Sequence, residues 1–195
     1  MYEVKPPPIL YYQPTGYLMR IIGGTHSGHR FFPPQKIPAR PTTDIAKEGL
    51  FNILQNTFDF EDLTALDLFG GTGSISYELA SRGCPAITCV ELDRQSAAFI
   101  AKTATEFGFP VQVVKTDVFK FIATCQQQFS FIFAGPPYPL TTIPDLPDLI
   151  FKHNLLLPGG WFVLEHNPHH QFNNHPQFLR SRSYGTTIFS IFGVS

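Results

Sequence analysis

The chain has little of several features that would assign a protein quickly to a class. Its 195 residues include three cysteines and no CxxC pair, a sparse and odd set that is typical of reduced thiols in the cytosol. The formal net charge is −1, so any RNA contact would require a local basic patch. No apolar run is long enough to span a membrane, and the proline-interrupted start lacks the pattern of a secretory signal. We therefore expect a cytoplasmic protein with no membrane partner.

Two familiar glycine motifs are also missing, namely the GxGxxG of dinucleotide enzymes and the GxxxxGK[ST] phosphate loop. The chain has instead the run Ala65-Leu66-Asp67-Leu68-Phe69-Gly70-Gly71-Thr72-Gly73-Ser74, an apolar strand with an acid that breaks into glycines. Residues 75–82 follow with helical periodicity. A strand, a glycine turn and a helix form the geometry of a nucleotide-type ligand site, and Asp67 is placed at the carboxyl end of the strand. Glycine at 71 and 73 lets the backbone approach a ligand closely.

Three later apolar segments each end at, or just before, residues that can contact a ligand. Glu91 is placed to accept hydrogen bonds from ribose hydroxyls. Asp117 follows the next segment, and Gly135-Pro136-Pro137-Tyr138 follows the third. Because parallel strands end at the same edge of a sheet, this pattern disfavours the alternative of a tight turn without a ligand. The three segments are residues 86–91, 111–115 and 129–134.

The remaining periodicity predicts an α/β, Rossmann-like chain. A helix capped by Thr43 or Asp44 and running to about Asn56 precedes the first strand.

Four histidines at 166, 169, 170 and 175 fit no zinc signature, so we predict a surface loop there and no metal site. We divide the chain into an irregular extension, residues 1–18, and one domain, residues 19–195. Further helices are predicted over 74–82, 95–107, 118–126 and 144–153, and further strands over 160–165, 178–184 and 186–192, the last two joined at Gly185 as an antiparallel hairpin.

The most basic part of the chain lies near its start. Residues 19–34 contain two short apolar runs, Ile21-Ile22 and Phe31-Phe32, around a glycine-rich turn, which predicts a β-hairpin. Basic side chains among aromatic ones suit a phosphate backbone and unpaired bases, although a solvated hairpin that covers a sheet edge explains them equally well. Arg40 and Thr42 come next, where they can reach a carboxylate or simply tie the loop down. The candidate RNA-binding residues are Arg20, His29, Arg30 and Lys36.

Four motifs follow one another in a fixed order: Arg40-Pro41-Thr42-Thr43-Asp44, Lys47-Glu48-Gly49-Leu50-Phe51-Asn52, the glycine turn and Gly-Pro-Pro-Tyr. With these motifs, the chain resembles the RsmD family from Met19 to Phe192. These are guanine-N2 methyltransferases of small-subunit (16S) ribosomal RNA. The resemblance implies a class I methyltransferase fold, a seven-stranded, mostly parallel sheet with helices on both faces and an N-terminal hairpin. It implies S-adenosylmethionine as cofactor, S-adenosylhomocysteine as product, and 16S RNA or the small subunit as partner of what we expect to be a monomer. The implied cofactor-binding residues are Arg40, Thr42, Asp67, Phe69, Gly71, Gly73, Glu91 and Asp117, and the implied catalytic residues are Gly135, Pro136, Pro137 and Tyr138.

One position departs from the family pattern. The motif after the fourth strand is Asp-Pro-Pro-Tyr/Phe, and here Gly135 stands in place of the acid. An exocyclic amine is a poor nucleophile whose attack is helped by hydrogen-bond acceptors, and losing one aligned group costs ~3–4 kcal/mol of transition-state stabilisation. Tyr138 can still stack on a flipped base. Restoring an aspartate at 135 is therefore expected to raise turnover.

Four interpretations stay open at this stage. The protein can be a slow methyltransferase, it can use another acceptor such as Glu165, or it can bind cofactor and RNA without useful turnover. A fourth interpretation is a DNA amino-methyltransferase, whose fourth-strand motif is similar. The basic hairpin and the lack of an evident second, DNA-reading domain argue against the fourth.

Overall fold

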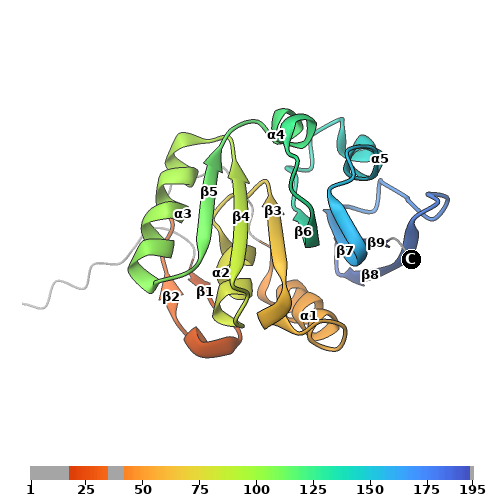
Figure 1. The fold of residues 1–195 in the computed structure, drawn as a ribbon. Helices are drawn as coiled ribbons and strands as arrows, with labels where there is room; N and C mark the ends of the chain where they lie inside the picture. The colour runs from red at the N-terminus through yellow and green to blue at the C-terminus, as the bar shows by residue number, and fades with distance from the viewer. Residues whose placement is uncertain (1–17, 35–41, 194–195) are drawn as a thin grey trace, which may run out of the picture.

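Strand β3, Thr64–Leu68, is an interior strand of a seven-stranded sheet in the computed structural model, which describes residues 18–34 and 42–193 (Figure 1). The strand order is β5-β4-β3-β6-β7-β9-β8, and among these strands β9 runs antiparallel to its neighbours. The order reverses between β3 and β6, which is where open α/β sheets bind ligands. The other strands are β4 (Ala86–Glu91), β5 (Val111–Lys115), β6 (Phe129–Ala134), β7 (Leu156–His166), β8 (Phe178–Tyr184) and β9 (Thr187–Gly193).

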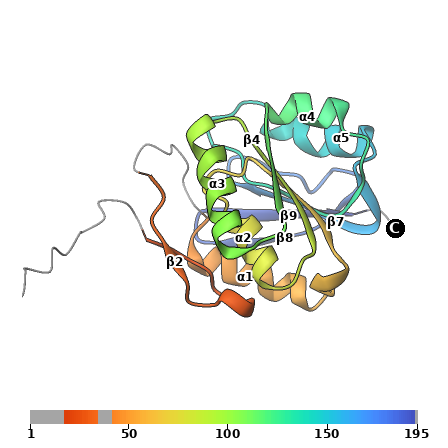
Figure 2. The same ribbon diagram turned by 60° about the vertical axis from the view of Figure 1, so that its left-hand side comes forward.

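Helices cover both faces of this sheet, as predicted (Figure 2). On one face lie α1 (Asp44–Gln55), α2 (Ser74–Ser81) and α3 (Arg94–Phe107). On the other lie α4 (Val118–Thr124) and α5 (Leu146–Lys152). Three short 3-10 turns add to these in the described part of the chain, at Gly24–His26, Phe60–Asp62 and Ile143–Asp145. Among the described residues, no helix combines the length and the apolar character needed to cross a membrane.

Strand β6 shows why the central strands have almost continuous apolar sequences. Phe131 and Phe133 pack into the core under α1 and α2, whereas Ile132 and Ala134 pack into the core under α4 and α5. All four residues are at most 2% exposed. A parallel strand covered on both faces has no solvent side, so its apolar residues do not alternate with polar ones.

The predicted N-terminal hairpin is present, and it is fastened to α2. Its strands are β1 (Met19–Arg20) and β2 (Arg30–Phe31), so the pairing is slightly offset from the apolar runs at Ile21-Ile22 and Phe31-Phe32. The carboxylate of Glu78, which has no exposed surface, accepts the backbone N–H groups of Ile22 and Gly23, each at 2.8 Å. The hairpin is therefore held by the buried side chain of Glu78.

Most predicted boundaries agree with the structure, and two details differ. Thr43 caps α1 through its side chain, which accepts the N–H of Ala46 at 3.3 Å. Strand β7 begins at Leu156, earlier than the predicted start at 160, because Gly159 and Gly160 lie inside a strand whose pairing with β6 is locally irregular. His166, predicted in a surface loop, is the last residue of β7 and only 2% exposed.

Candidate active site

The turn after β3 has a backbone conformation that exposes its peptide groups. Phe69, Gly71 and Gly73 have φ values of 63°, 56° and 82°, all in the left-handed region. A non-glycine residue such as Phe69 adopts this region at a cost of order 1 kcal/mol, typically at functional sites. The N–H of Gly70 donates to the carbonyl of Val90 at 2.9 Å, and the N–H of Gly73 to that of Gly70 at 2.7 Å. The N–H of Tyr77 in α2 donates to the carbonyl of Gly73 at 2.9 Å, so the glycine turn is tied to the end of β4 as well as to α2.

Asp67 lies beneath the turn and supports it. The side chain is 2% exposed, and its Oδ2 accepts the hydroxyl of Ser76 at 2.6 Å and the N–H of Ser76 at 3.1 Å. Burial raises the pKa of Asp67 to about 7, although the hydrogen bonds from Ser76 act in the opposite direction. Ser76 was not singled out from the sequence, because a serine inside an amphipathic helix carries no distinctive signal.

Glu91 and Asp117 lie at the same edge of the sheet. Glu91 Oε2 accepts the N–H of Gly71 at 2.7 Å, so the carboxylate at the end of β4 contacts the glycine turn directly. Its Oε1 accepts the N–H of Asp93, also at 2.7 Å. Asp117 caps α4 by accepting the N–H of Lys120 at 3.0 Å. The N–H of Thr116 donates to the carbonyl of Glu91 at 3.1 Å, which joins these two strand ends.

The Gly-Pro-Pro-Tyr segment meets the glycine turn from the other side. The N–H of Gly135 donates to the carbonyl of Leu68 at 3.3 Å, immediately before Phe69. Gly135 is partly exposed, Pro136 is buried and Pro137 is exposed. The two segments that the sequence assigned to cofactor and to chemistry are therefore adjacent at the carboxyl ends of β3 and β6.

A carboxylate from the next strand stands beside Gly135. Glu165, 8% exposed near the end of β7, accepts the hydroxyl of Thr42 at 2.6 Å through Oε2. Its Oε1 accepts the hydroxyl of Tyr138 at 3.3 Å. A Cβ atom built on Gly135 would lie 3.9 Å from Glu165 Oε2 and 3.1 Å from the ring of Phe133. The carboxylate that Thr42 reaches is thus Glu165.

The candidate RNA-binding residues are distributed unevenly. His29 and Arg30 are exposed on the hairpin, whereas Arg20 is half-exposed and its Nε lies 2.7 Å from Asp44 Oδ2. The buried ammonium of Lys47 donates to the carbonyl of Arg20 at 2.6 Å, and burial lowers the pKa of Lys47. The fourth candidate, Lys36, lies outside the described residues, as does Arg40, which was predicted to bind the cofactor.

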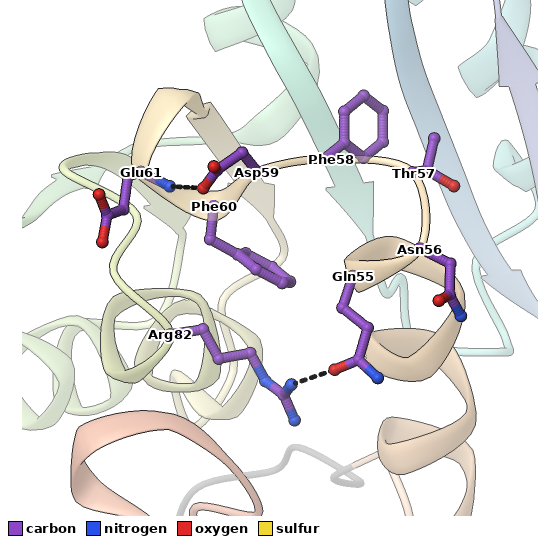
Figure 3. A pocket seen from close by; sticks show the side chains of 8 residues that line it. All are labelled: Gln55, Asn56, Thr57, Phe58, Asp59, Phe60, Glu61 and Arg82. Carbon is purple, nitrogen blue, oxygen red and sulfur yellow. Dashed lines mark hydrogen bonds between the residues drawn. The ribbon is translucent and has the colours of Figure 1, made fainter.

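A separate cavity of about 540 Å³ lies at the opposite end of the sheet (Figure 3). It is formed where α1 leads into β3 and where α2 ends, and Arg82 donates there to Gln55 at 3.3 Å. Its position at the amino ends of the strands separates it from the candidate site. Within residues 18–34 and 42–193, no three histidine, cysteine or acidic side chains are grouped to hold a metal ion.

The sheet order, the glycine turn beneath which Asp67 lies, and the acids at successive strand ends define the Rossmann-like fold of the class I methyltransferases. The sequence profile of the family described as Conserved hypothetical protein 95 matches residues 19–193. The chain belongs to this family, the RsmD family of methyltransferases.

A curated relative agrees with that membership, and two solved structures share the fold. The ribosomal RNA small subunit methyltransferase D of Escherichia coli K12 is 32% identical over 148 residues, covering 75% of this chain and 71% of the relative. A solved structure of the E. coli putative methyltransferase yhhF has a TM-score of 0.80 at 23% identity, covering 92% of this chain and 100% of that one. The Thermus thermophilus 16S rRNA N2-guanine methyltransferase RsmC, solved with AdoMet and guanosine, has a TM-score of 0.71 at 20% identity, covering 92% of this chain and 50% of that one.

Proposed function

We propose that this protein transfers a methyl group from S-adenosylmethionine to the exocyclic N2 amine of a guanine in small-subunit 16S ribosomal RNA. The observation that carries the proposal is the hydrogen bond of 3.3 Å from the Gly135 N–H to the Leu68 carbonyl, which sets the Gly-Pro-Pro-Tyr segment against the glycine turn. Methyl transfer requires a cofactor pocket and a base pocket to share a wall, and these two segments provide that arrangement. Family membership and the E. coli relative support ribosomal RNA as the substrate class.

The residues around the glycine turn fit an adenosyl cofactor. The left-handed backbone at Gly71 presents peptide groups rather than side chains, and the Glu91 carboxylate beside it suits the two ribose hydroxyls. Asp117 lies at the adjoining strand end, where it suits the adenine amine. Asp67 is too deeply buried to do more than hold the turn, so we assign it a positioning role toward the methionine end. The bound cofactor supplies an electrophilic methyl group on sulfur.

The residues after β6 fit a base that has left its stack. Tyr138 offers an aromatic face for stacking, and the carbonyls of Gly135 and Pro136 offer acceptors for amine protons. The exposed hairpin residues His29 and Arg30, together with Lys36, supply the contacts to the RNA backbone. We further propose that the protein acts in the cytoplasm as a monomer and that the transfer needs no metal.

A binding-only role is the second candidate, and the missing side chain at Gly135 favours it. In that case the protein binds cofactor and ribosomal RNA on the same surfaces but transfers methyl groups slowly or not at all. The two candidates share every binding residue and differ only in turnover.

The test is transfer of label from methyl-labelled S-adenosylmethionine to small ribosomal subunits that lack the modification, followed by nucleoside analysis. Labelled N2-methylguanosine is the expected product. Cofactor and subunit binding without any label would support the binding-only role. Label on another base would refute the guanine assignment, and absence of S-adenosylhomocysteine binding would refute both candidates.

A further inference from the structure

We propose that the Glu165 carboxylate serves as the hydrogen-bond acceptor for the guanine amine, in place of the acidic side chain that position 135 lacks. The inference rests on the proposed function and adds to it the group that assists the reacting nitrogen. Glu165 lies one strand away from the motif, at the end of β7. The pairing of Ala134 with Leu164 brings Gly135 and Glu165 side by side at the edge of the sheet.

The first argument is position. The carboxylate oxygens of an aspartate lie only two bonds beyond its Cβ, and Glu165 Oε2 lies 3.9 Å from the Cβ position of residue 135. Glu165 therefore places negative charge in the region where a motif aspartate would place its own. Gly135 is partly exposed, and it has no side chain of its own between position 135 and Glu165.

The second argument is orientation. The short hydrogen bond of 2.6 Å from Thr42 holds one carboxylate oxygen, and the longer one of 3.3 Å from Tyr138 reaches the other. An amine N–H arriving over Tyr138 would share Oε1 with that longer and weaker bond. A carboxylate held in this way needs little reorganisation when the nitrogen becomes tetrahedral, which is how preorganised groups stabilise a transition state.

The chemistry balances without a further reactant. The nitrogen lone pair forms the bond to the methyl carbon as the carbon–sulfur bond breaks and its electron pair stays on sulfur. The proton that the nitrogen then loses passes to the Glu165 carboxylate and from there to water. Glu165 returns to its ionised form, so the step consumes only the methyl donor and the amine.

The experiment compares Glu165→Gln with the double variant Gly135→Asp/Glu165→Gln in single turnover on small subunits. We expect the single variant to lose about 100-fold in rate, as for a lost oxyanion-hole donor, and the double variant to recover most of it. Gly135→Asp alone should gain little, because its carboxylate would stand beside that of Glu165. This expectation replaces the larger gain expected from the sequence. Glu106→Gln, an exposed change on α3, is the matched control.

A second readout does not depend on turnover. Guanosine and inosine differ by the exocyclic amine, so the protein saturated with S-adenosylhomocysteine should prefer guanosine by about tenfold, the strength of a hydrogen bond to a charged group. Glu165→Gln should reduce that preference, and the double variant should restore it. Thermal melting and S-adenosylhomocysteine affinity show whether each variant is folded.

Two results would overturn the inference. One is an unchanged rate or an unchanged guanosine preference in folded Glu165→Gln, and the other is equal affinity for the two nucleosides in the unaltered protein. Failure of the proposed function looks different, because the unaltered protein would then label no subunit while the nucleoside preference still reports on Glu165.

Discussion

The hydroxyl of Ser76 lies 2.6 Å from Oδ2 of Asp67, and this contact joins helix α2 to strand β3 inside the protein. Asp67 is almost fully buried, and burial raises its pKa from 3.8 to about 7. The folded state therefore binds the proton of the Asp67 carboxyl group more tightly than the unfolded state does. The contribution of Asp67 to stability is complete below about pH 4 and is lost as the pH rises to about 7.

Asp67→Asn should remove this pH dependence. The unfolding free energy of the variant minus that of the unaltered protein should be roughly 2–4 kcal/mol larger at about pH 8 than at about pH 5. The reason is that the aspartate becomes a buried charge over this range and the asparagine does not. Urea unfolding at the two pH values measures the difference. The exposed Asp62→Asn should stay within about 0.5 kcal/mol at both. A constant difference for Asp67→Asn would contradict the buried, protonated carboxyl.

Glu91→Ala should weaken cofactor binding. The Glu91 carboxylate holds the Gly71 N–H and is proposed to bind the ribose, so its loss should lower S-adenosylhomocysteine affinity by about 10- to 100-fold. Titration calorimetry measures the affinity. A melting curve checks that the turn is retained, and Glu106→Ala on α3 serves as the control. Unaltered affinity in a folded Glu91→Ala protein would exclude the ribose contact.

Glu78→Gln should loosen the N-terminal hairpin. The change removes the negative charge that faces the Arg82 guanidinium at 2.9 Å. It also replaces one of the two oxygens that accept the N–H groups of Ile22 and Gly23 with an NH2 donor. We expect a loss of roughly 3 kcal/mol in stability, as for other broken buried ion pairs. Trypsin should then cut faster after Arg20 or Arg30. Glu61→Gln, at an exposed position, should change neither measurement, and equal cleavage of the two variants would argue against the anchor.

Charge reversal at Arg30 and Lys36 should weaken binding to the small subunit. Each lost phosphate contact should reduce the slope of log affinity against log salt by about 0.7–0.9. Affinity for S-adenosylhomocysteine should not change, because the hairpin lies outside the cofactor pocket. A variant reversed at Lys102 and Lys120, on α3 and α4, controls for net charge. If both variants bind the subunit equally well, the hairpin is not the RNA contact.

The sequence was sufficient for the order and type of the main elements. The strand around Asp67 was predictable because a covered parallel strand is apolar and ends abruptly at polar or glycine residues. Strand β5, before Asp117, lies at the edge of the sheet and was predictable from its valines alone, since Gln112 and Lys115 are exposed. The start of β7 was not predictable, because two glycines such as Gly159 and Gly160 normally interrupt a strand. In the structure the neighbouring β6 accommodates them with an irregular register.

The site was predictable only where its residues follow single strands. The contact between Thr42 and Glu165 joins positions 123 residues apart, and no local pattern encodes it. The same holds for the anchor from Glu78 to the hairpin, because a buried acid on a short helix looks like any amphipathic position until its partners are known. Such contacts depend on tertiary packing rather than on periodicity.

The fastened hairpin has a consequence for the thermodynamics of association. A free basic arm would lose its conformational freedom on meeting RNA, at roughly 1–2 kcal/mol per ordered residue. Here the loss for the segment from Met19 to Phe31 occurs when the chain folds, with the carboxylate of Glu78 as its anchor. A partner that docks on this surface would meet a preformed shape, so its binding should show little of the unfavourable entropy that accompanies coupled folding.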